Sequence, residues 1–226
     1  IQARGVSGFG FVSSRSYDTL DRLKTSTDAR QGVTTLFHDG QDQLRQVLDP
    51  RNLATVYQRN GLGDLTQLSS PDTGVASSSH DANGNLLTRS DSRGVTATYT
   101  YDALNRRTAL VYAKPGQVSQ AYAWTYDQSG GDFGAGVGRL TTATHPAGST
   151  QYGYDTQGRL TRSLQSIGDS TFNTRYGYDA AGQLTHITYP SGRVLTIAYE
   201  AGRPVSLSLA SGAGSAAQPL VSQIQW

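Results

Sequence analysis

A short sequence unit returns at a fixed interval along the first half of this 226-residue chain. Each copy opens on an aromatic residue or a replacement for it, followed by a short acid or Asn. Five such openings lie 21 residues apart, at Tyr17, His38, Arg59, His80 and Tyr101. Four more follow at intervals of 25, 28, 24 and 21 residues, at Tyr126, Tyr154, Tyr178 and Tyr199. Self-similarity of this kind indicates an array in which each copy is one supersecondary unit.

The order of residues within the unit predicts a hairpin turn. Position two is Asp, Asn or Glu in every copy, and these side chains accept hydrogen bonds from nearby backbone N–H groups at the start of a turn. Position five is usually Gly, Asn or Asp, which tolerate the positive φ of hairpin loops. Position seven is usually Leu, where a strand resumes. The residues that define this motif are Tyr17, Asp18, Asp39, Leu44, Asp81, Gly84, Leu86, Tyr101, Asp102, Tyr154, Asp155, Gly158, Arg159, Leu160, Tyr178, Asp179, Gly182 and Leu184.

The residues that precede each unit alternate in character. Two residues before the opening the side chain is mostly large and apolar, and the interposed residue is mostly small or polar. Because side chains of a strand point alternately to its two faces, one face of the predicted sheet is aromatic and aliphatic and the other small and polar. The apolar residues of this series are Leu36, Tyr57, Tyr99, Trp124, Tyr152, Tyr176 and Ile197.

A second turn is visible between successive copies, so one repeat holds two strands and two turns. Nine copies therefore predict about 18 antiparallel strands. Strong helix formers are scarce, with 2 Lys, one Glu and no Met, which agrees with an all-β fold. Flat sheets of this length are unstable, so we expect tandem antiparallel β-hairpin repeats in one long, curved, coiling strip. The second turns are predicted at 28–32, 49–52, 71–74, 91–94, 146–148 and 190–192.

The repeats define the expected organisation of the chain. Residues 1–16 are interpreted as the tail of a preceding repeat, and 17–209 as nine β-hairpin repeats with a Gly-rich insertion at 127–138, expected to be a long exposed loop. Residues 210–226 are interpreted as a loop and the truncated start of a further strand. Because the chain begins with Ile1, we expect a piece of a longer protein whose targeting signal lies outside it.

Composition argues against several classes of site. The chain has no Cys, which excludes disulfides and thiolate metal ligands, and its net charge of +2 is small for a nucleic-acid-binding protein. No apolar run approaches the roughly 20 residues of a membrane helix. The four His lack metal-ligand spacing, and turn formation explains the Asp column better than a calcium ladder does. We therefore expect no cofactor, no metal and no catalytic residue, and the protein is predicted not to be an enzyme.

The motif resembles the YD repeat of the Rhs family, most closely at residues 154–161 and 178–185. This resemblance implies a long β-strip that spirals into a hollow shell around a C-terminal toxin domain. It further implies a non-catalytic segment of the shell wall, secreted or displayed at the cell surface through a parent protein. The implied partners are the rest of the parent chain and its toxin cargo.

A second interpretation stays open. The aromatic face gives the means to stack on sugars, so the chain is alternatively a cell-surface adhesion or carbohydrate-binding repeat array, with Trp124 and Tyr152 as candidate glycan contacts. The unpaired edges and aromatic face of an isolated strip also predict edge-to-edge self-association.

Overall fold

The computed structural model describes residues 3–4 and 12–224, and this part of the chain is built almost entirely from β-strands joined by short turns. It divides into two units, residues 1–106 with 111–119 and residues 107–110 with 120–226. The strand β11 (Arg107–Ala113) is split between them. One short 3-10 turn, η1 (Gly131–Phe133), is the one helical element of the described residues.

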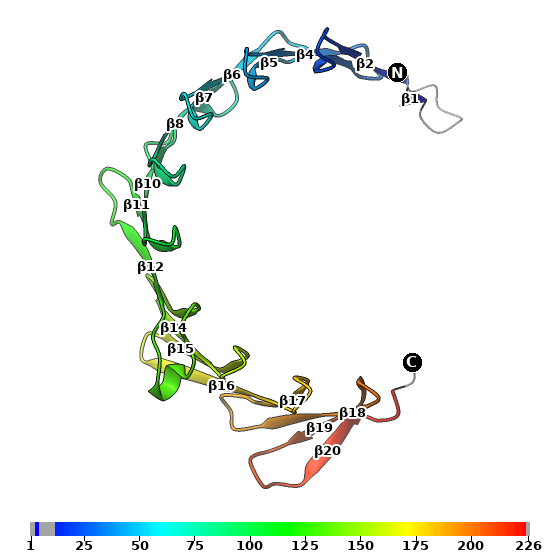
Figure 1. Cartoon of the computed structure of the whole chain (residues 1–226), viewed down its shortest axis with the longest axis vertical. Coiled ribbons are helices and arrows are strands. Elements are labelled where there is room, and N and C mark those ends of the chain that lie inside the picture. Colours follow the sequence, from blue (N-terminus) through cyan, green and yellow to red (C-terminus); the bar gives the residue numbers. More distant parts are fainter. Residues whose placement is uncertain (1–2, 5–11, 225–226) are drawn as a thin grey trace. The chain divides into compact units, whose positions relative to one another are not determined.

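The first unit is a succession of antiparallel hairpins in which each strand pairs with the next along the chain (Figure 1). Its strands are β1 (Ala3–Arg4), β2 (Val12–Tyr17), β3 (Leu23–Thr27), β4 (Val33–His38), β5 (Leu44–Leu48), β6 (Ala54–Arg59), β7 (Leu65–Ser70), β8 (Gly74–His80), β9 (Leu86–Ser90) and β10 (Thr96–Tyr101).

The second unit continues the same pattern of antiparallel neighbours. Its strands are β12 (Gln120–Tyr126), β13 (Leu140–His145), β14 (Gly148–Tyr154), β15 (Leu160–Ile167), β16 (Ser170–Tyr178), β17 (Leu184–Thr188), β18 (Val194–Glu200), β19 (Arg203–Ala210) and β20 (Ala217–Val221). The predicted all-β fold of tandem antiparallel hairpins is confirmed. Within each unit the strands follow a curved path, as the twist of a long sheet requires (Figure 1).

Each unit is a single layer of sheet, and few of its side chains are buried. The buried residues of the described chain include Ala97, Leu110, Ala210 and the fully enclosed Thr141. A single layer has no second layer against which to bury an apolar face. Most of its cohesion must therefore come from contacts between neighbouring strands and neighbouring turns.

The turn that follows each motif opening has a register shift in the strand pairing. The shift aligns position one with position seven, so that Tyr17 lies opposite Leu23, and Tyr178 opposite Leu184. Position five has positive φ in these turns, from 58° at Asp21 to 89° at Gly63. This is the geometry of a type I turn followed by a left-handed residue and a bulge. The last copy differs, because Ala201 and Gly202 both have positive φ and form a two-residue turn between Glu200 and Arg203.

The Gly-rich insertion at 127–138 is more ordered than the exposed loop we expected. It contains η1, and the N–H of Ala135 donates to the carbonyl of Tyr154 at 3.0 Å. Gly153 on β14 is buried directly beneath it, where a Cβ would collide with the carbonyl oxygen of Asp132. Small residues at these close approaches let the insertion pack on the sheet.

Position five provides a direct test of the turn geometry. Gly182 has a φ of +84°, and a side chain in this region costs about 1–2 kcal/mol. We expect Gly182→Ala to lower the free energy of unfolding by that amount. Gly40→Ala is the matched control, because Gly40 lies in a motif turn without positive φ and with open space around it. Urea unfolding of both variants measures the difference, and equal stabilities would contradict the assigned geometry.

Candidate functional site

The acid at position two organises the backbone of each motif turn. Oδ1 of Asp18 accepts two hydrogen bonds, from the N–H of Leu20 at 2.9 Å and from the N–H of Arg22 at 3.0 Å. The backbone N–H of Asp18 donates to the carbonyl of Arg22 at 2.9 Å, and the N–H of Asp21 donates to the carbonyl of Asp18 at 3.2 Å. One residue thus takes part in four hydrogen bonds that close a five-residue loop. Asn60 does the same with its amide oxygen, so the loop needs an acceptor rather than a charge.

Three of the second turns, at the opposite ends of the strands, have the same construction. Oδ1 of Asp28 accepts from the N–H groups of Arg30 and Gly32, and Asp49 and Asp91 make the equivalent pairs. The positive φ falls on Gln31, Asn52 and Gly94. We predicted turns at these places but not their identity with the motif turns. The sequence signal common to both kinds of turn is an Asp three residues before the residue with positive φ. At Gln31 this signal is hard to recognise, because Gln rarely adopts positive φ.

Hydrogen bonding shifts the titration of these carboxyl groups. The N–H groups of Gln43 and Gln41 lower the pKa of Asp39 below its ordinary value. At Asp155 partial burial raises the pKa, but the N–H of Arg159, its guanidinium and a further N–H outweigh it, so that the pKa is again lowered. The carboxylate form is therefore the one that the folded turn stabilises.

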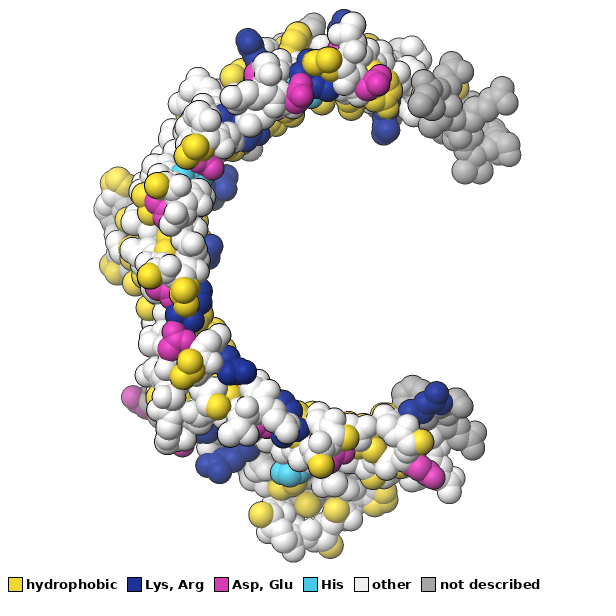
Figure 2. Space-filling model, viewed as in Figure 1, with side chains coloured by type: hydrophobic (Ala, Val, Ile, Leu, Met, Phe, Trp, Pro, Cys, Tyr) yellow, Lys and Arg dark blue, Asp and Glu magenta, His cyan; other side chains and the backbone are white. Residues whose placement is uncertain are grey.

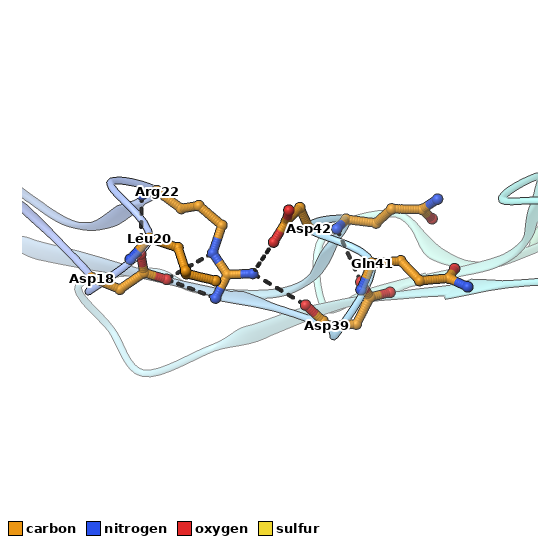
Figure 3. Close-up of polar contacts among 7 residues, drawn as sticks. Asp18, Leu20, Arg22, Asp39, Gln41 and Asp42 are labelled. Atoms are coloured by element: carbon orange, nitrogen blue, oxygen red, sulfur yellow. Dashed lines mark hydrogen bonds and ion pairs between the residues drawn. The ribbon is translucent and has the colours of Figure 1, made fainter.

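Arginine at position six joins one motif turn to the next. The guanidinium of Arg22 lies 2.7 Å from Oδ2 of Asp18 in its own turn. It also donates to the carbonyl of Asp39 at 3.1 Å and to Oδ1 of Asp42 in the following turn at 2.5 Å (Figure 3). Because it contacts both turns, this guanidinium has a structural role: it links one motif turn to the next. Figure 2 shows acidic and basic side chains interspersed with uncharged ones on the visible face.

The same bridge recurs in the second unit. Arg159 contacts Oδ2 of Asp155 at 2.6 Å and donates to the carbonyl of Asp179, one turn further on, at 3.1 Å. Its guanidinium lies 4.7 Å from the ring centroid of Tyr178, a distance typical of a cation–π contact. In the copy with Asn85 at position six, an amide takes the place of the arginine: Asn85 donates to the side chain of Asn105 in the following turn at 2.7 Å.

In five of the copies, a tyrosine at position one closes the gap between consecutive hairpins. Consecutive hairpins are joined by a second turn at one end of their strands. At the other end, beside the motif turns, no loop connects the last strand of one hairpin to the first strand of the next, and we call this open end the seam. The ladder between β15 and β16 stops at Arg162 and Arg175, but the hydroxyl of Tyr178 donates to the carbonyl of Leu160 at 2.9 Å beyond it. Four other tyrosines make the equivalent bond to position seven of the preceding copy: Tyr101, Tyr126, Tyr154 and Tyr199.

The two candidate glycan contacts lie apart from each other. Trp124 is on β12 and Tyr152 on β14, with β13 between them, and both side chains are half-buried. The guanidinium of Arg107 lies 5.7 Å from the centroid of the Trp124 ring. The structure therefore places the two rings on strands that are not direct neighbours.

The described surface has an open hollow at the end of the second unit that is large enough to hold a ligand. Within residues 3–4 and 12–224 there is no group of three or more His, Asp or Glu side chains placed to hold a metal ion. That part of the chain also has no helix long and apolar enough to cross a membrane. An open hollow of about 500 Å³ lies over the end of the second unit, and its lining is mostly aliphatic: Tyr189, Ser191, Arg193, Leu195, Leu207, Leu209 and Leu220.

Removing one seam hydroxyl tests the tyrosine bond. We expect Tyr178→Phe to lower the free energy of unfolding by about 0.5–1.5 kcal/mol, since the carbonyl of Leu160 loses its donor. Tyr57→Phe is the control, because Tyr57 belongs to the aromatic series two residues before an opening rather than to a seam. Urea unfolding compares the two, and a loss no larger in Tyr178→Phe than in Tyr57→Phe would refute the assignment.

The lowered carboxyl pKa values predict the direction of the pH dependence. A folded-state pKa below the unfolded value of about 3.9 stabilises the fold above that pH, and the contribution is lost as pH falls through the folded value. We expect Asp39→Asn and Asp81→Asn to keep the loop, as Asn60 does, but to lose less stability than the unaltered chain between neutral pH and pH of about 2. Urea midpoints across this range measure it, and parallel curves would contradict it.

Comparison with known proteins agrees with this geometry. The RHS Repeat family matches residues 80–117, 136–171, 164–194 and 178–213, which together cover more than half of the chain. A protein named probable deoxyribonuclease RhsA, from Dickeya dadantii (strain 3937), is 29% identical over 166 residues, which are 72% of this chain and 11% of that protein.

Solved structures share the fold at low sequence identity. The Photorhabdus luminescens Tc holotoxin pore superposes with a TM-score of 0.77 and 18% identity, over 96% of this chain and 12% of that one. The TcdB2-TccC3 complex without its hypervariable C-terminal region gives a TM-score of 0.76 and 17% identity, with the same coverage. This chain thus spans a small fraction of each protein that it resembles. The repeated turn, the seam and the family match together show that the chain belongs to the RHS repeat family.

Proposed function

We propose that this chain is a structural segment of an Rhs-type β-shell that encloses a C-terminal toxin domain of its parent protein, and that it does so without catalysis. Its task in this proposal is steric. The segment separates the cargo from proteases and from targets until delivery. The parent protein is exported or displayed at the cell surface, and the partners of the segment are the remaining shell and the cargo.

The closed seam is the observation that carries this proposal. A wall must exclude macromolecules between its repeats as well as within them. In this chain the backbone ladder stops short of the motif turns. Tyrosine hydroxyls fill the remaining gap at Tyr101, Tyr126, Tyr154, Tyr178 and Tyr199, and the guanidinium of Arg22 fills it at Asp39. The groups that would otherwise be available for chemistry at the turns, Arg22 and Asp18 among them, are engaged in these contacts.

The relatives support the same conclusion at the level of whole proteins. One of the solved structures is a Tc holotoxin pore, and another is described as lacking a hypervariable C-terminal region. The Dickeya dadantii relative carries the name of a nuclease, and this chain corresponds to 11% of it. We assign any such activity in the parent protein to a part other than these repeats.

Limited proteolysis of the full-length parent protein tests the enclosure. A cleavage sequence for a specific protease is inserted into the region that follows Trp226, and an identical sequence is placed in that region expressed alone. We expect rapid cleavage of the isolated region and of the denatured parent, and protection in the native parent. Rapid cleavage in the native parent, with the repeats intact, would refute enclosure.

A glycan screen tests the alternative of a carbohydrate-binding array. Under our proposal the chain binds no member of a broad glycan panel. Binding that is lost in Trp124→Ala or Tyr152→Ala, with unfolding unchanged, would instead favour adhesion.

A further inference from the structure

The motif turns of the first unit present leucines to solvent at every second repeat. The side chains of Leu20, Leu62 and Leu104 are 63%, 74% and 71% exposed. All three occupy position four, and each backbone N–H donates to the position-two side chain of its own turn. They lie 42 residues apart, which is four strands, or roughly 19 Å along the sheet. They form a regular row along the edge of the sheet that holds the motif turns, here called the motif edge.

The turn itself does not need these leucines. Gln41 and Asn83 stand at position four in the intervening repeats, and their N–H groups make the same hydrogen bond. Polar residues are the usual choice at such exposed turn positions. Three large apolar side chains in solvent therefore indicate a contact outside the unit.

The opposite edge of the same unit, here called the return edge, carries a second aliphatic row. Val33 is the first residue of β4 and Val75 the second residue of β8, and both strands leave this edge. The two valines are 44% and 46% exposed and also lie 42 residues apart. Leu53, 38% exposed, lies between them. The interval between Val33 and Val75 equals that between successive leucines of the motif edge, because the same strands set both.

The two edges also differ in charge. The five motif turns, at 18–22, 39–43, 60–64, 81–85 and 102–106, contain seven Asp and two Arg. The return turns, at 28–32, 49–53, 70–74, 91–95 and 114–117, contain four Asp and four basic residues. Arg51 and Arg93 of the return edge have side chains that are 63% and 76% exposed, and Asp42 of the motif edge is 68% exposed.

We propose that the motif edge of this unit docks against the return edge of a second copy of the chain. The leucines of one edge then meet Val33 and Val75 of the other at equal spacing. The acidic turns face Arg51 and Arg93, whose exposed guanidinium groups also pair with Asp49, Asp72 and Asp91 of their own edge. Two motif edges would instead bring acidic turns together. Because the two surfaces differ, the contact is head to tail and open-ended. This inference does not depend on cargo enclosure.

Sedimentation velocity over a micromolar to near-millimolar range tests the contact. We expect the average mass of the chain to rise with concentration, and to rise less at high salt. The motif-edge variant Leu20→Gln/Leu62→Gln/Leu104→Gln, which copies the residue type of Gln41, is expected to raise the dissociation constant at least about tenfold without changing the melting temperature. Val137→Gln is the control, because Val137 is 65% exposed and lies in the second unit.

A mixing experiment tests the head-to-tail arrangement. The return-edge variant Val33→Thr/Val75→Thr/Arg51→Glu/Arg93→Glu is expected to be monomeric alone, like the motif-edge variant. Each variant retains one intact edge, so their equimolar mixture should form a dimer and go no further. A wild-type chain that stays monomeric throughout, a motif-edge variant that associates like wild type, or a return-edge variant that still self-associates would each overturn the proposal.

Discussion

The structure depends on a short side-chain oxygen that accepts two backbone N–H groups at the start of a turn. A single-layer sheet lacks the opposed apolar surface that stabilises sandwiches and barrels, so its strands must be held in register by their connections. Oδ1 of Asp18 and Oδ1 of Asn60 meet this need with the same pair of bonds. Because the loop is five residues long and closed at both ends, each hairpin built on it leaves the turn in the same register.

Regular turns then allow contacts from one repeat to the next. The distance between motif turns is set by two strand spacings, and an arginine at position six spans it, as Arg22 and Arg159 do. A tyrosine at position one reaches the carbonyl of position seven in the preceding copy for the same reason. Each contact involves only adjacent repeats. Stability is therefore expected to be a sum of local contributions, as in other linear repeat proteins.

The period, the all-β fold and the position of the motif turns were predictable from the sequence, because they follow from residue types with strong local preferences. The seam was not, since the partner of Tyr178 is a carbonyl that only the strand register brings within reach. The folded insertion escaped prediction for a related reason. Gly134 and Gly153 permit close packing between segments, and composition alone does not distinguish this from flexibility.

Exposed leucines at alternate turns set the first unit apart from what local folding requires. A turn that tolerates Gln41 and Asn83 gains nothing locally from Leu62, and an apolar side chain in water carries a cost in solubility. The interval of two repeats excludes a requirement shared by all turns, because such a requirement would appear in every repeat. A contact with a surface of the same pitch explains both the residue type and the interval. The return edge of another copy has that spacing because the same repeats set it, whereas an unrelated surface would match it only by coincidence.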